Sequence, residues 1–354
     1  MTIQDIRSKI DSIDEQVLKL LNQRARLALE IGHLKAVDGR VPFVPAREIQ
    51  LLERLQSLNK GPLPPTAVRA VYREIISACR NLERPISIAY WGPPATQTHL
   101  AAIQQFGESA DYEPVRTIAD VFNAVETSRQ DFGVVPVENS TAGSVQDTLD
   151  HFSDTSLTIC AEVLLPVHFA LLTTEESLAE IKRIYSIPIA VEQCRGWLAD
   201  HLPNVEIIDA APTSRAAQLA SEEPNAAAIA GRLAAEIYQL NILYDRIEDS
   251  AHNTTRFLVI GHHSPDPSGR DKTSIMFAAP HRPGGLNAVL NCLQAHNINL
   301  TMINSRPTRR MPWEYLFYVD VQGHSQDPGL KEALDAMRSR CDFLRILGSY
   351  PESA

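Results

Sequence analysis

Four basic residues near the start of the chain, Arg7, Arg24, Lys35 and Arg47, are spaced so that they could hold a small molecule with two negative charges. Arg24 and Lys35 are eleven residues apart, so on a helix both project from one face roughly 16 Å apart. Arg7 lies seventeen residues before Arg24, roughly 25 Å along the same helix, which is too far to touch the same ligand. Arg7 can join the site only if an antiparallel second copy of the helix brings it there. The spacing therefore predicts an intertwined dimer in which each pocket uses two chains.

One long helix over residues 3–36 is predicted to position these cations. Its apolar residues alternate spacings of four and three, as packed helices require, and Arg24 occupies the one missing position. Burying a guanidinium without an anion would cost several kcal/mol. Arg24 therefore needs a carboxylate partner, a bound anion, or a route to water. The apolar seam consists of Ile6, Ile10, Ile13, Val17, Leu20, Leu27, Ile31 and Leu34.

Two further helices are predicted, over 47–58 and 66–82, each after a proline-containing turn. Glu83 continues the spacing of the inward stripe on the third helix, which predicts that its carboxyl points inward. The first 84 residues carry 14 Lys and Arg against 10 Asp and Glu, although the whole chain has a net charge of −10. A locally basic bundle suits a small anion. Nucleic acid is disfavoured because no single-sign tract or basic–aromatic interleaving occurs.

This segment resembles the all-helical chorismate mutases, in the order of its arginines, an Ile-Asp pair, a lysine and an Arg-Glu pair after a proline-bearing loop. The resemblance implies rearrangement of chorismate to prephenate, which needs no nucleophile or cofactor, only a held conformation and positive charge at the breaking C–O bond. On matching positions Arg7, Arg24 and Arg47 would hold the two substrate carboxylates. Lys35 would reach the ether oxygen, and Glu48 would accept a hydrogen bond from the ring hydroxyl.

Glu83 departs from this pattern, because many relatives have glutamine there, and Val44 stands where some carry aspartate. A glutamine donates to the ether oxygen at any pH, whereas a carboxyl must carry its proton to do so. We expect either that burial keeps Glu83 neutral or that mutase activity falls as the pH rises. The plainer alternative is a surface residue at a fraying helix end.

After Arg84-Pro85 the pattern changes to short apolar strands that alternate with helices, which predicts a largely parallel α/β sheet. The region is too long for one compact layer, so we expect two lobes with a cleft and a ligand at the carboxyl ends of strands. Strands are predicted at 86–91, 132–139, 157–164, 168–173, 183–191, 205–210, 226–230 and 255–261, and helices at 99–106, at 118–128 and from about 144.

Three polar segments fall at such strand ends. Thr96 and Thr98 follow the first strand, and Glu138, Asn139, Ser140 and Thr141 separate a strand from a helix. The third segment, Thr254 to Arg256, opens the last strand. Taken singly, each is consistent with helix caps or a solvated arginine, or with anion binding at a helix start.

Taken in this order, the segments resemble the prephenate dehydratases, whose two-lobed fold is similar to periplasmic binding proteins. Their motifs are Gly-Pro-x-Gly-Thr-Phe-Ser, Asn-Ser after a Val-Pro-x-Glu strand, and Thr-Arg-Phe. The resemblance implies that no metal is needed and that Thr255 donates a proton to the departing ring hydroxyl. Arg256 would hold a carboxylate, while Thr96, Glu138, Asn139 and Ser140 would shape the pocket.

The chain departs from these motifs in two places. Ala95 to Thr98 lack the usual glycine and aromatic residue, and Ser186 to Ile189 stand where relatives often have Ser-His-Pro-Gln. Both could line the cleft. The preference between prephenate and its transaminated form, arogenate, therefore stays open.

Residues 272–354 follow a linker rich in Pro, Ser and charge, and their order βαββαβ predicts a ferredoxin-like fold. They resemble ACT domains, which bind amino acids at paired interfaces. Relatives bind phenylalanine through Gly-Ala-Leu and Glu-Ser-Arg-Pro, which here read Gly284-Gly285-Leu286 and Asn304-Ser305-Arg306-Pro307. The alternative is an ACT fold that only dimerises.

Three domains follow, an all-α mutase (1–84), a two-lobed α/β dehydratase (85–264) and an α+β ACT domain (272–354). No apolar leader or membrane-length stretch occurs, and the five cysteines lack metal or redox spacing, as expected of a cytoplasmic enzyme without metal or cofactor. The order resembles the fused chorismate mutase/prephenate dehydratases of L-phenylalanine biosynthesis. This implies chorismate and prephenate as substrates, L-phenylalanine as effector and a homodimer or dimer of dimers. The alternatives are an arogenate-preferring dehydratase with a weak mutase and a non-catalytic amino-acid-sensing regulator.

Overall fold

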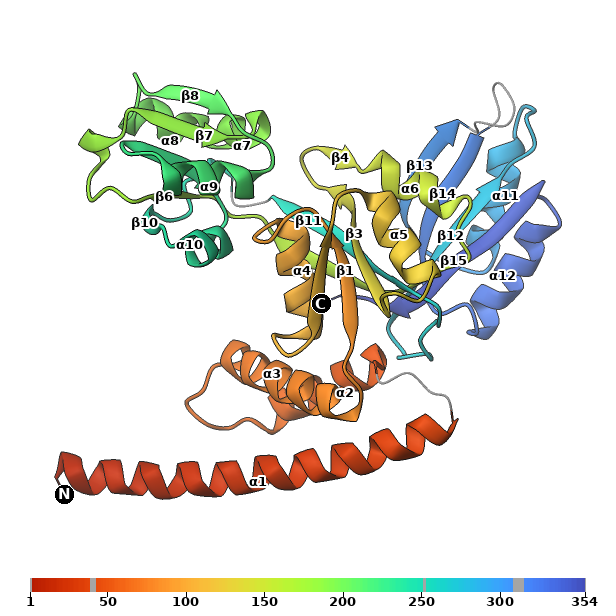
Figure 1. Ribbon diagram of the computed structural model, residues 1–354. Coiled ribbons are helices and arrows are strands. Elements are labelled where there is room, and N and C mark those ends of the chain that lie inside the picture. Colours follow the sequence, from red (N-terminus) through yellow and green to blue (C-terminus); the bar gives the residue numbers. More distant parts are fainter. Residues whose placement is uncertain (1, 39–42, 251–252, 308–314, 354) are drawn as a thin grey trace. The chain divides into compact units, whose positions relative to one another are not determined.

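The computed structural model describes residues 2–38, 43–250, 253–307 and 315–353 (Figure 1). The chain divides into two compact units. The first comprises residues 1–87 and 106–111, and the second comprises 88–105 and 112–354.

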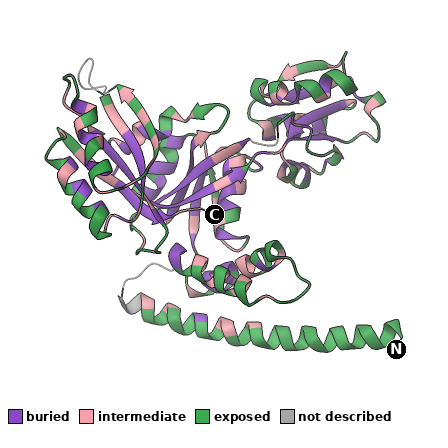
Figure 2. Cartoon of the chain, turned by 180° about the vertical axis from the view of Figure 1, so that it is seen from behind, coloured by how far each residue is buried: buried purple, intermediate pink, exposed green. Residues whose placement is uncertain are grey.

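The first unit contains the three predicted helices. They are α1 (Ile3–Asp38), α2 (Pro45–Leu58) and α3 (Pro65–Glu83). Pro45 and Pro65 are the first residues of α2 and α3, where the missing N–H of proline removes no helical hydrogen bond. The apolar seam of α1 is largely exposed in the single chain, with Leu20 62% and Leu34 69% accessible (Figure 2).

The second unit begins with a lobe built on one mixed sheet in the order β2-β1-β3-β11-β5, with β4 on β3. Strands β1 and β3 are parallel, whereas β11 is antiparallel to both β3 and β5. The elements of this lobe are β1 (Ser87–Trp91), α4 (Gln97–Phe106), β2 (Asp111–Val115), α5 (Ile118–Glu126), β3 (Phe132–Asn139), β4 (Gly143–Ser144), α6 (Gln146–Phe152), β5 (Thr158–Pro166) and β11 (Thr254–Gly261).

A second lobe is formed by the chain between β5 and β11, around a sheet in the order β10-β6-β9-β7-β8. Strand β7 is parallel to β8 and β9, but β6 is antiparallel to β9 and β10. Its elements are β6 (Ala170–Thr173), a 3₁₀ turn (Leu178–Glu180), β7 (Arg183–Ser186), α7 (Pro188–Gln193), α8 (Arg195–His201), β8 (Glu206–Asp209), α9 (Thr213–Glu222), β9 (Ala226–Ala230), α10 (Arg232–Tyr238) and β10 (Asn241–Tyr244).

Two details of the predicted α/β region are wrong. Both sheets are mixed rather than largely parallel, because β11 and β6 run against their neighbours. The strand predicted over 183–191 ends at Ser186, and Pro188 begins helix α7 instead. Proline at the first helical position favours this start.

The C-terminal part has the predicted order βαββαβ and an antiparallel sheet in the order β13-β14-β12-β15. The apolar segment that begins at Trp313 predicts the third of these strands. The structure describes this strand from Tyr315, and residues 308–314 lie outside the described ranges. The elements are β12 (Asp271–Ala278), α11 (Gly285–Ala295), β13 (Leu300–Pro307), β14 (Tyr315–Gln322), α12 (Pro328–Arg338) and β15 (Phe343–Pro351).

The C-terminal sheet shares a hydrophobic core with the first lobe. Leu347 and Tyr350 of β15 pack in one buried cluster with Phe152 and Ile159 of the lobe. A Cβ added at Gly348 would lie 2.3 Å from the Ile159 backbone oxygen, so only glycine allows β15 to pass this close to β5. The contact fixes the C-terminal sheet against the lobe that carries β11.

Candidate active sites

Two ion pairs join the three helices of the first unit. Lys35 Nζ donates to Glu83 Oε2 at 2.9 Å, and Arg80 Nη1 donates to Glu48 Oε1 at 2.5 Å. Gly32 lies one turn before Lys35, and a Cβ there would be 3.0 Å from Glu83 Cα, so α1 and α3 approach closely at this point. The structure thus brings together three of the predicted mutase residues, Lys35, Glu48 and Glu83.

Arg80 was missed by sequence reasoning, although it follows the inward-facing Cys79 on α3. It is only 4% exposed, donates from Nη2 to the Phe106 backbone oxygen at 2.5 Å, and stacks over the rings of Phe43 and Phe106. Burial raises the pKa of Glu48, while the nearby positive charges of Arg80 and Lys35 oppose this rise. Arg80 therefore holds the Glu48 carboxyl in place inside the unit.

The remaining predicted cations lie on the surface of the single chain. Arg24 is half-buried, whereas Arg7 and Arg47 are exposed. Because α1 is a continuous helix from Ile3 to Asp38, Arg7 cannot fold back toward Lys35 of the same chain. Completion of a pocket by Arg7 stays a prediction that needs a second chain.

The three polar segments of the α/β region meet at one edge of the first lobe. The carboxyl ends of the parallel strands β1 and β3 lie at this edge, and β11, which runs the other way, begins there. Thr255 is the direct cross-strand partner of Asn139. Asn139 and Thr255, 116 residues apart in the chain, are therefore direct neighbours.

Asn139 orients the Thr255 hydroxyl. Its Nδ2 donates to Thr255 Oγ1 at 2.7 Å and to Asn253 Oδ1 at 2.8 Å. Its Oδ1 accepts hydrogen bonds from the backbone N–H groups of Thr141 and Ala142 at 3.0 and 2.9 Å. These backbone donors fix which end of the amide faces Thr255. Since Thr255 Oγ1 accepts from Asn139, its own proton can be donated to another molecule.

Asn253 and Gln193 extend this network and were not among the predicted residues. Asn253 is buried, and its Nδ2 donates to Gln193 Oε1 at 2.8 Å. Gln193 Nε2 donates in turn to Thr141 Oγ1 at 3.2 Å. Gln193 ends α7, so the second lobe reaches directly into the polar cluster around Thr255. Strand alternation could have indicated Asn253, which is two residues before Thr255 and shares its face.

Thr96 and Ser140 have structural contacts at the same edge. Thr96 Oγ1 accepts from the His99 N–H at 3.3 Å, as a cap of α4, and Ser140 Oγ accepts from the Thr254 N–H at 3.0 Å. Ala95, which replaces the motif glycine, has a φ of 69°, so the loop keeps a left-handed turn despite the side chain. Glu138 is half-buried and lies opposite Ser144 on β4.

The position of Arg256 does not suit its predicted role, which is to bind a carboxylate of the substrate. It is 8% exposed, and its Nε, Nη1 and Nη2 donate to Glu162, Asp320 and Tyr350. The guanidinium is thus enclosed by protein groups on the side of the C-terminal domain. This differs from the sequence-based expectation.

The two predicted effector segments occupy different places in the C-terminal domain. Gly284, with a φ of 78°, precedes α11, which begins with Gly285 and Leu286. Leu286, Tyr315 and Phe317 help to line a hollow of about 290 Å³. Asn304 instead donates to Ser144 Oγ, and Arg306 donates twice to Asp150 Oδ1. Ser305 and Pro307 complete the end of β13.

Comparison with known proteins accounts for all three parts of the chain. Family models match for chorismate mutase type II over residues 6–84, prephenate dehydratase over 88–265 and the ACT domain over 273–338. The bifunctional chorismate mutase/prephenate dehydratase of Aquifex aeolicus is 44% identical, over 99% of this chain and 98% of its own length. That of Neisseria gonorrhoeae is 45% identical, over 98% of this chain and 96% of its own.

The chain belongs to the bifunctional chorismate mutase/prephenate dehydratase family. The solved prephenate dehydratase of Arthrobacter aurescens, in complex with L-Phe, is similar with a TM-score of 0.70 and 32% identity, covering 75% of this chain and 90% of that one. The predicted family and fold class are therefore confirmed, with a helical chorismate mutase domain, a two-lobed prephenate dehydratase domain and an ACT domain. Within the described ranges, no helix has the length and apolar character to span a bilayer.

Proposed function

We propose that the helical unit converts chorismate to prephenate and that the first lobe, with Thr255 as proton donor, converts prephenate to phenylpyruvate. The hydrogen bond from Asn139 Nδ2 to Thr255 Oγ1 supports the second assignment most directly, because it leaves the hydroxyl proton for the substrate. Together the two reactions serve L-phenylalanine biosynthesis.

The dehydratase step needs little more than an oriented proton. The bond between the ring carbon and its hydroxyl breaks as Thr255 protonates the departing oxygen, which leaves as water, and Thr255 then regains a proton from the solvent. The bond to the ring carboxylate breaks to release CO₂, and its electron pair completes the aromatic ring. Proton donation by a positioned group supports such a step by about 10²- to 10⁴-fold. Thr96, Glu138, Asn139 and Ser140 are proposed to shape the pocket around Thr255.

In the mutase step, the substrate rearranges in one concerted movement of electrons. The ammonium of Lys35 stabilises the negative charge that develops on the ether oxygen. Glu83, whose Oε2 accepts from Lys35 Nζ at 2.9 Å, would donate a second hydrogen bond only when its carboxyl carries a proton. Glu48, held by Arg80, accepts from the ring hydroxyl. Arg24, Arg47 and the partner chain's copy of Arg7 are proposed to hold the two carboxylates.

A homodimer is proposed as the working form of the mutase. The exposed seam of α1 supports this, because so long an apolar stripe on one helix requires a packing partner. Dimers could pair further into tetramers. We also propose a cytoplasmic location, since all five cysteines are free thiols, as is usual in a reducing compartment.

L-phenylalanine is the proposed effector of the ACT domain. The proposed residues are the loop at Gly284 to Leu286 and the end of β13 from Asn304 to Pro307. Because these segments occupy different places within one chain, the proposed site lies where ACT domains of two chains pair. The domain assignment and the L-Phe complex of the Arthrobacter aurescens relative support this. Equilibrium dialysis with labelled phenylalanine tests it, and an absence of saturable binding would leave an ACT domain that only assembles chains.

The dehydratase assignment is tested by replacing Thr255 with Ala. We expect formation of phenylpyruvate to fall at least about 10²-fold while chorismate consumption stays unchanged. Thr254→Ala is the matched control, because alternation along β11 turns its side chain to the other face. Retained dehydratase turnover in Thr255→Ala would remove Thr255 from the mechanism.

Assays with prephenate and with arogenate, side by side, separate the two dehydratase specificities. Inactivity on both substrates would indicate a non-catalytic regulator.

A further inference from the structure

Consecutive residues of β11 serve two different domains. Thr255 bonds to Asn139 at the edge of the dehydratase sheet, whereas Arg256 bonds to Asp320 and Tyr350 of the ACT domain. Successive side chains of a strand point to opposite faces, and these two residues share a peptide bond, so a backbone shift at Arg256 also displaces Thr255. The register with β3 also shifts directly after Arg256, and such a bulge sets the direction of nearby side chains.

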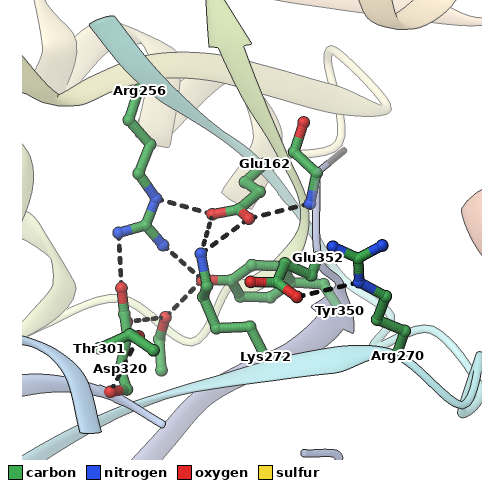
Figure 3. A network of polar contacts seen from close by, with 10 residues as sticks. Glu162, Arg256, Arg270, Lys272, Thr301, Asp320, Tyr350 and Glu352 are labelled. Carbon is green, nitrogen blue, oxygen red and sulfur yellow. Dashed lines mark hydrogen bonds and ion pairs between the residues drawn. The ribbon is translucent and has the colours of Figure 1, made fainter. Parts of the chain in front are cut away.

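All three parts of the Arg256 fork are used (Figure 3). Nε donates to Glu162 Oε2 at 2.7 Å, Nη1 to Asp320 Oδ2 at 2.5 Å and Nη2 to Tyr350 Oη at 2.8 Å. Because the guanidinium is planar and rigid, three bonds in three directions fix both its position and its orientation. One of these partners belongs to the dehydratase sheet, and the other two belong to β14 and β15 of the ACT domain.

A second ring of contacts holds these partners. Lys272 Nζ lies 2.8 and 2.9 Å from the two oxygens of Glu162, and Ser274 Oγ bonds to Asp320 at 2.5 Å and to Tyr350 Oη at 2.7 Å. The cluster therefore balances two cations with two carboxylates in a largely buried site, and Tyr350 is fully buried. Most of its members come from the ACT domain.

We propose that Arg256 is a positioning residue for Thr255 and that Asp320 and Tyr350 of the ACT domain anchor it, so that the ACT domain is a working part of the dehydratase site. This rests on the proposed role of Thr255 as proton donor. A misplacement of about 1 Å can cost an enzyme about 10²-fold in rate, so loss of a single anchor is sufficient to slow proton donation. Substrate binding does not require the anchor, since Arg256 is enclosed by protein groups.

The test compares Tyr350→Phe and Asp320→Asn with the parent in the full-length chain. Tyr350→Phe removes only the hydroxyl that accepts from Arg256, and Asp320→Asn keeps the shape but removes the charge. We expect kcat for prephenate to fall at least about tenfold, with KM within about twofold of the parent. Mutase activity, which resides in the other unit, should not change. Arg270→Gln is the matched control, because it breaks an exposed pair with Glu352 of the same domain.

An unchanged kcat in both variants would overturn the proposal. So would a rise in KM at constant kcat, since that is the signature of a residue that binds the substrate. If Asp320→Asn does not fold, Tyr350→Phe decides the matter alone, because it adds no charge and removes no packing volume beyond one oxygen. Activity retained in Thr255→Ala would instead contradict the proposed function, so the two failures are distinguishable.

Discussion

Lys35 of α1 and Glu83, the last residue of α3, meet at 2.9 Å although 48 residues separate them in the chain. Their side chains are mostly shielded from water, with 24% and 12% exposed. Both groups could donate a hydrogen bond to the ether oxygen of chorismate. The ammonium always donates, whereas the carboxyl donates only when it carries a proton.

Glu83→Gln is therefore expected to change the pH dependence of the mutase. In the parent, kcat/KM for chorismate should fall as the pH rises, because a carboxylate cannot donate to the ether oxygen. The amide of glutamine donates at every pH, so the variant should keep its rate. The loss of chorismate absorbance, followed at several pH values, measures the pH–rate profiles of the parent and the variant. Glu53→Gln, at an exposed position of α2, is the control. Superimposable pH–rate profiles for the parent and Glu83→Gln would contradict a role of Glu83 as hydrogen-bond donor.

Replacing Asn139 with Asp should disable the dehydratase without disturbing the loop. The carboxylate can still accept from the backbone N–H groups of Thr141 and Ala142, but it cannot donate to Thr255. The Thr255 hydroxyl would then turn its proton toward the new carboxylate, and we expect phenylpyruvate formation to fall about 10²-fold. Asn123→Asp, on the exposed face of α5, introduces the same charge elsewhere. A variant of Asn139 with the parent's rate would show that the amide does not orient Thr255.

Leu20→Asp should dissociate the proposed dimer and thereby lower mutase activity. Leu20 is 62% exposed in the single chain, and a carboxylate on the α1 seam would have to be buried in the dimer, at a cost of several kcal/mol. Sedimentation equilibrium should show a lower mass, and mutase activity should fall at least about tenfold because Arg7 of the partner chain is lost. Dehydratase activity is measured in parallel. Asn22→Asp places the same charge on the other side of α1, and an unchanged mass in Leu20→Asp would contradict the intertwined dimer.

Glu162 should make the junction of the dehydratase and ACT domains sensitive to acid. Burial acts to raise the pKa of Glu162, but the charges of Arg256 and Lys272 outweigh it and hold the pKa below the ordinary value of 4.5. A carboxyl with a lowered pKa contributes stability that is complete above its unfolded pKa and is lost as the pH falls through the folded one.

We therefore expect Glu162→Gln to lower the free energy of unfolding by about 3–5 kcal/mol at neutral pH, with the difference narrowing below pH 4.5. Urea unfolding at several pH values measures this difference. Glu352→Gln, which disrupts the exposed pair with Arg270, should show little effect at any pH. A difference for Glu162→Gln that stays constant into acid would show that the loss comes from packing alone.

Much of the fold was accessible from the sequence, because strong periodicity identifies helices and buried strands. The three N-terminal helices, the strands at Phe132–Asn139 and Ala226–Ala230 and the C-terminal βαββαβ order were all predictable in this way. The run from Ile187 to Val191 was not, since a short apolar stretch suits a buried strand and a helix equally well. Strand direction was also inaccessible, because β11 and β6 pair with strands far away in the chain.

The residues of the candidate sites likewise divide into those that the sequence could predict and those that it could not. The motif residues Asn139 and Thr255 could be found from local sequence, and the sheet brings them together. Arg80 and Gln193 could not, because their roles depend on partners that only the folded chain supplies. Arg256 shows the limit most clearly. Its neighbours in the motif suggest substrate binding, but its partners Asp320 and Tyr350 lie 64 and 94 residues further along the chain.

The balanced and largely buried cluster around Arg256 has a consequence for the ionic conditions that the protein tolerates. Dissolved ions weaken attractions between charges at the surface but hardly reach pairs enclosed by protein. Concentrated salt would thus loosen the proposed hold of exposed Arg47 on chorismate while leaving the attachment of Arg256 to Glu162 and Asp320 intact. The junction proposed to position Thr255 should therefore withstand ionic strengths that weaken the proposed capture of chorismate.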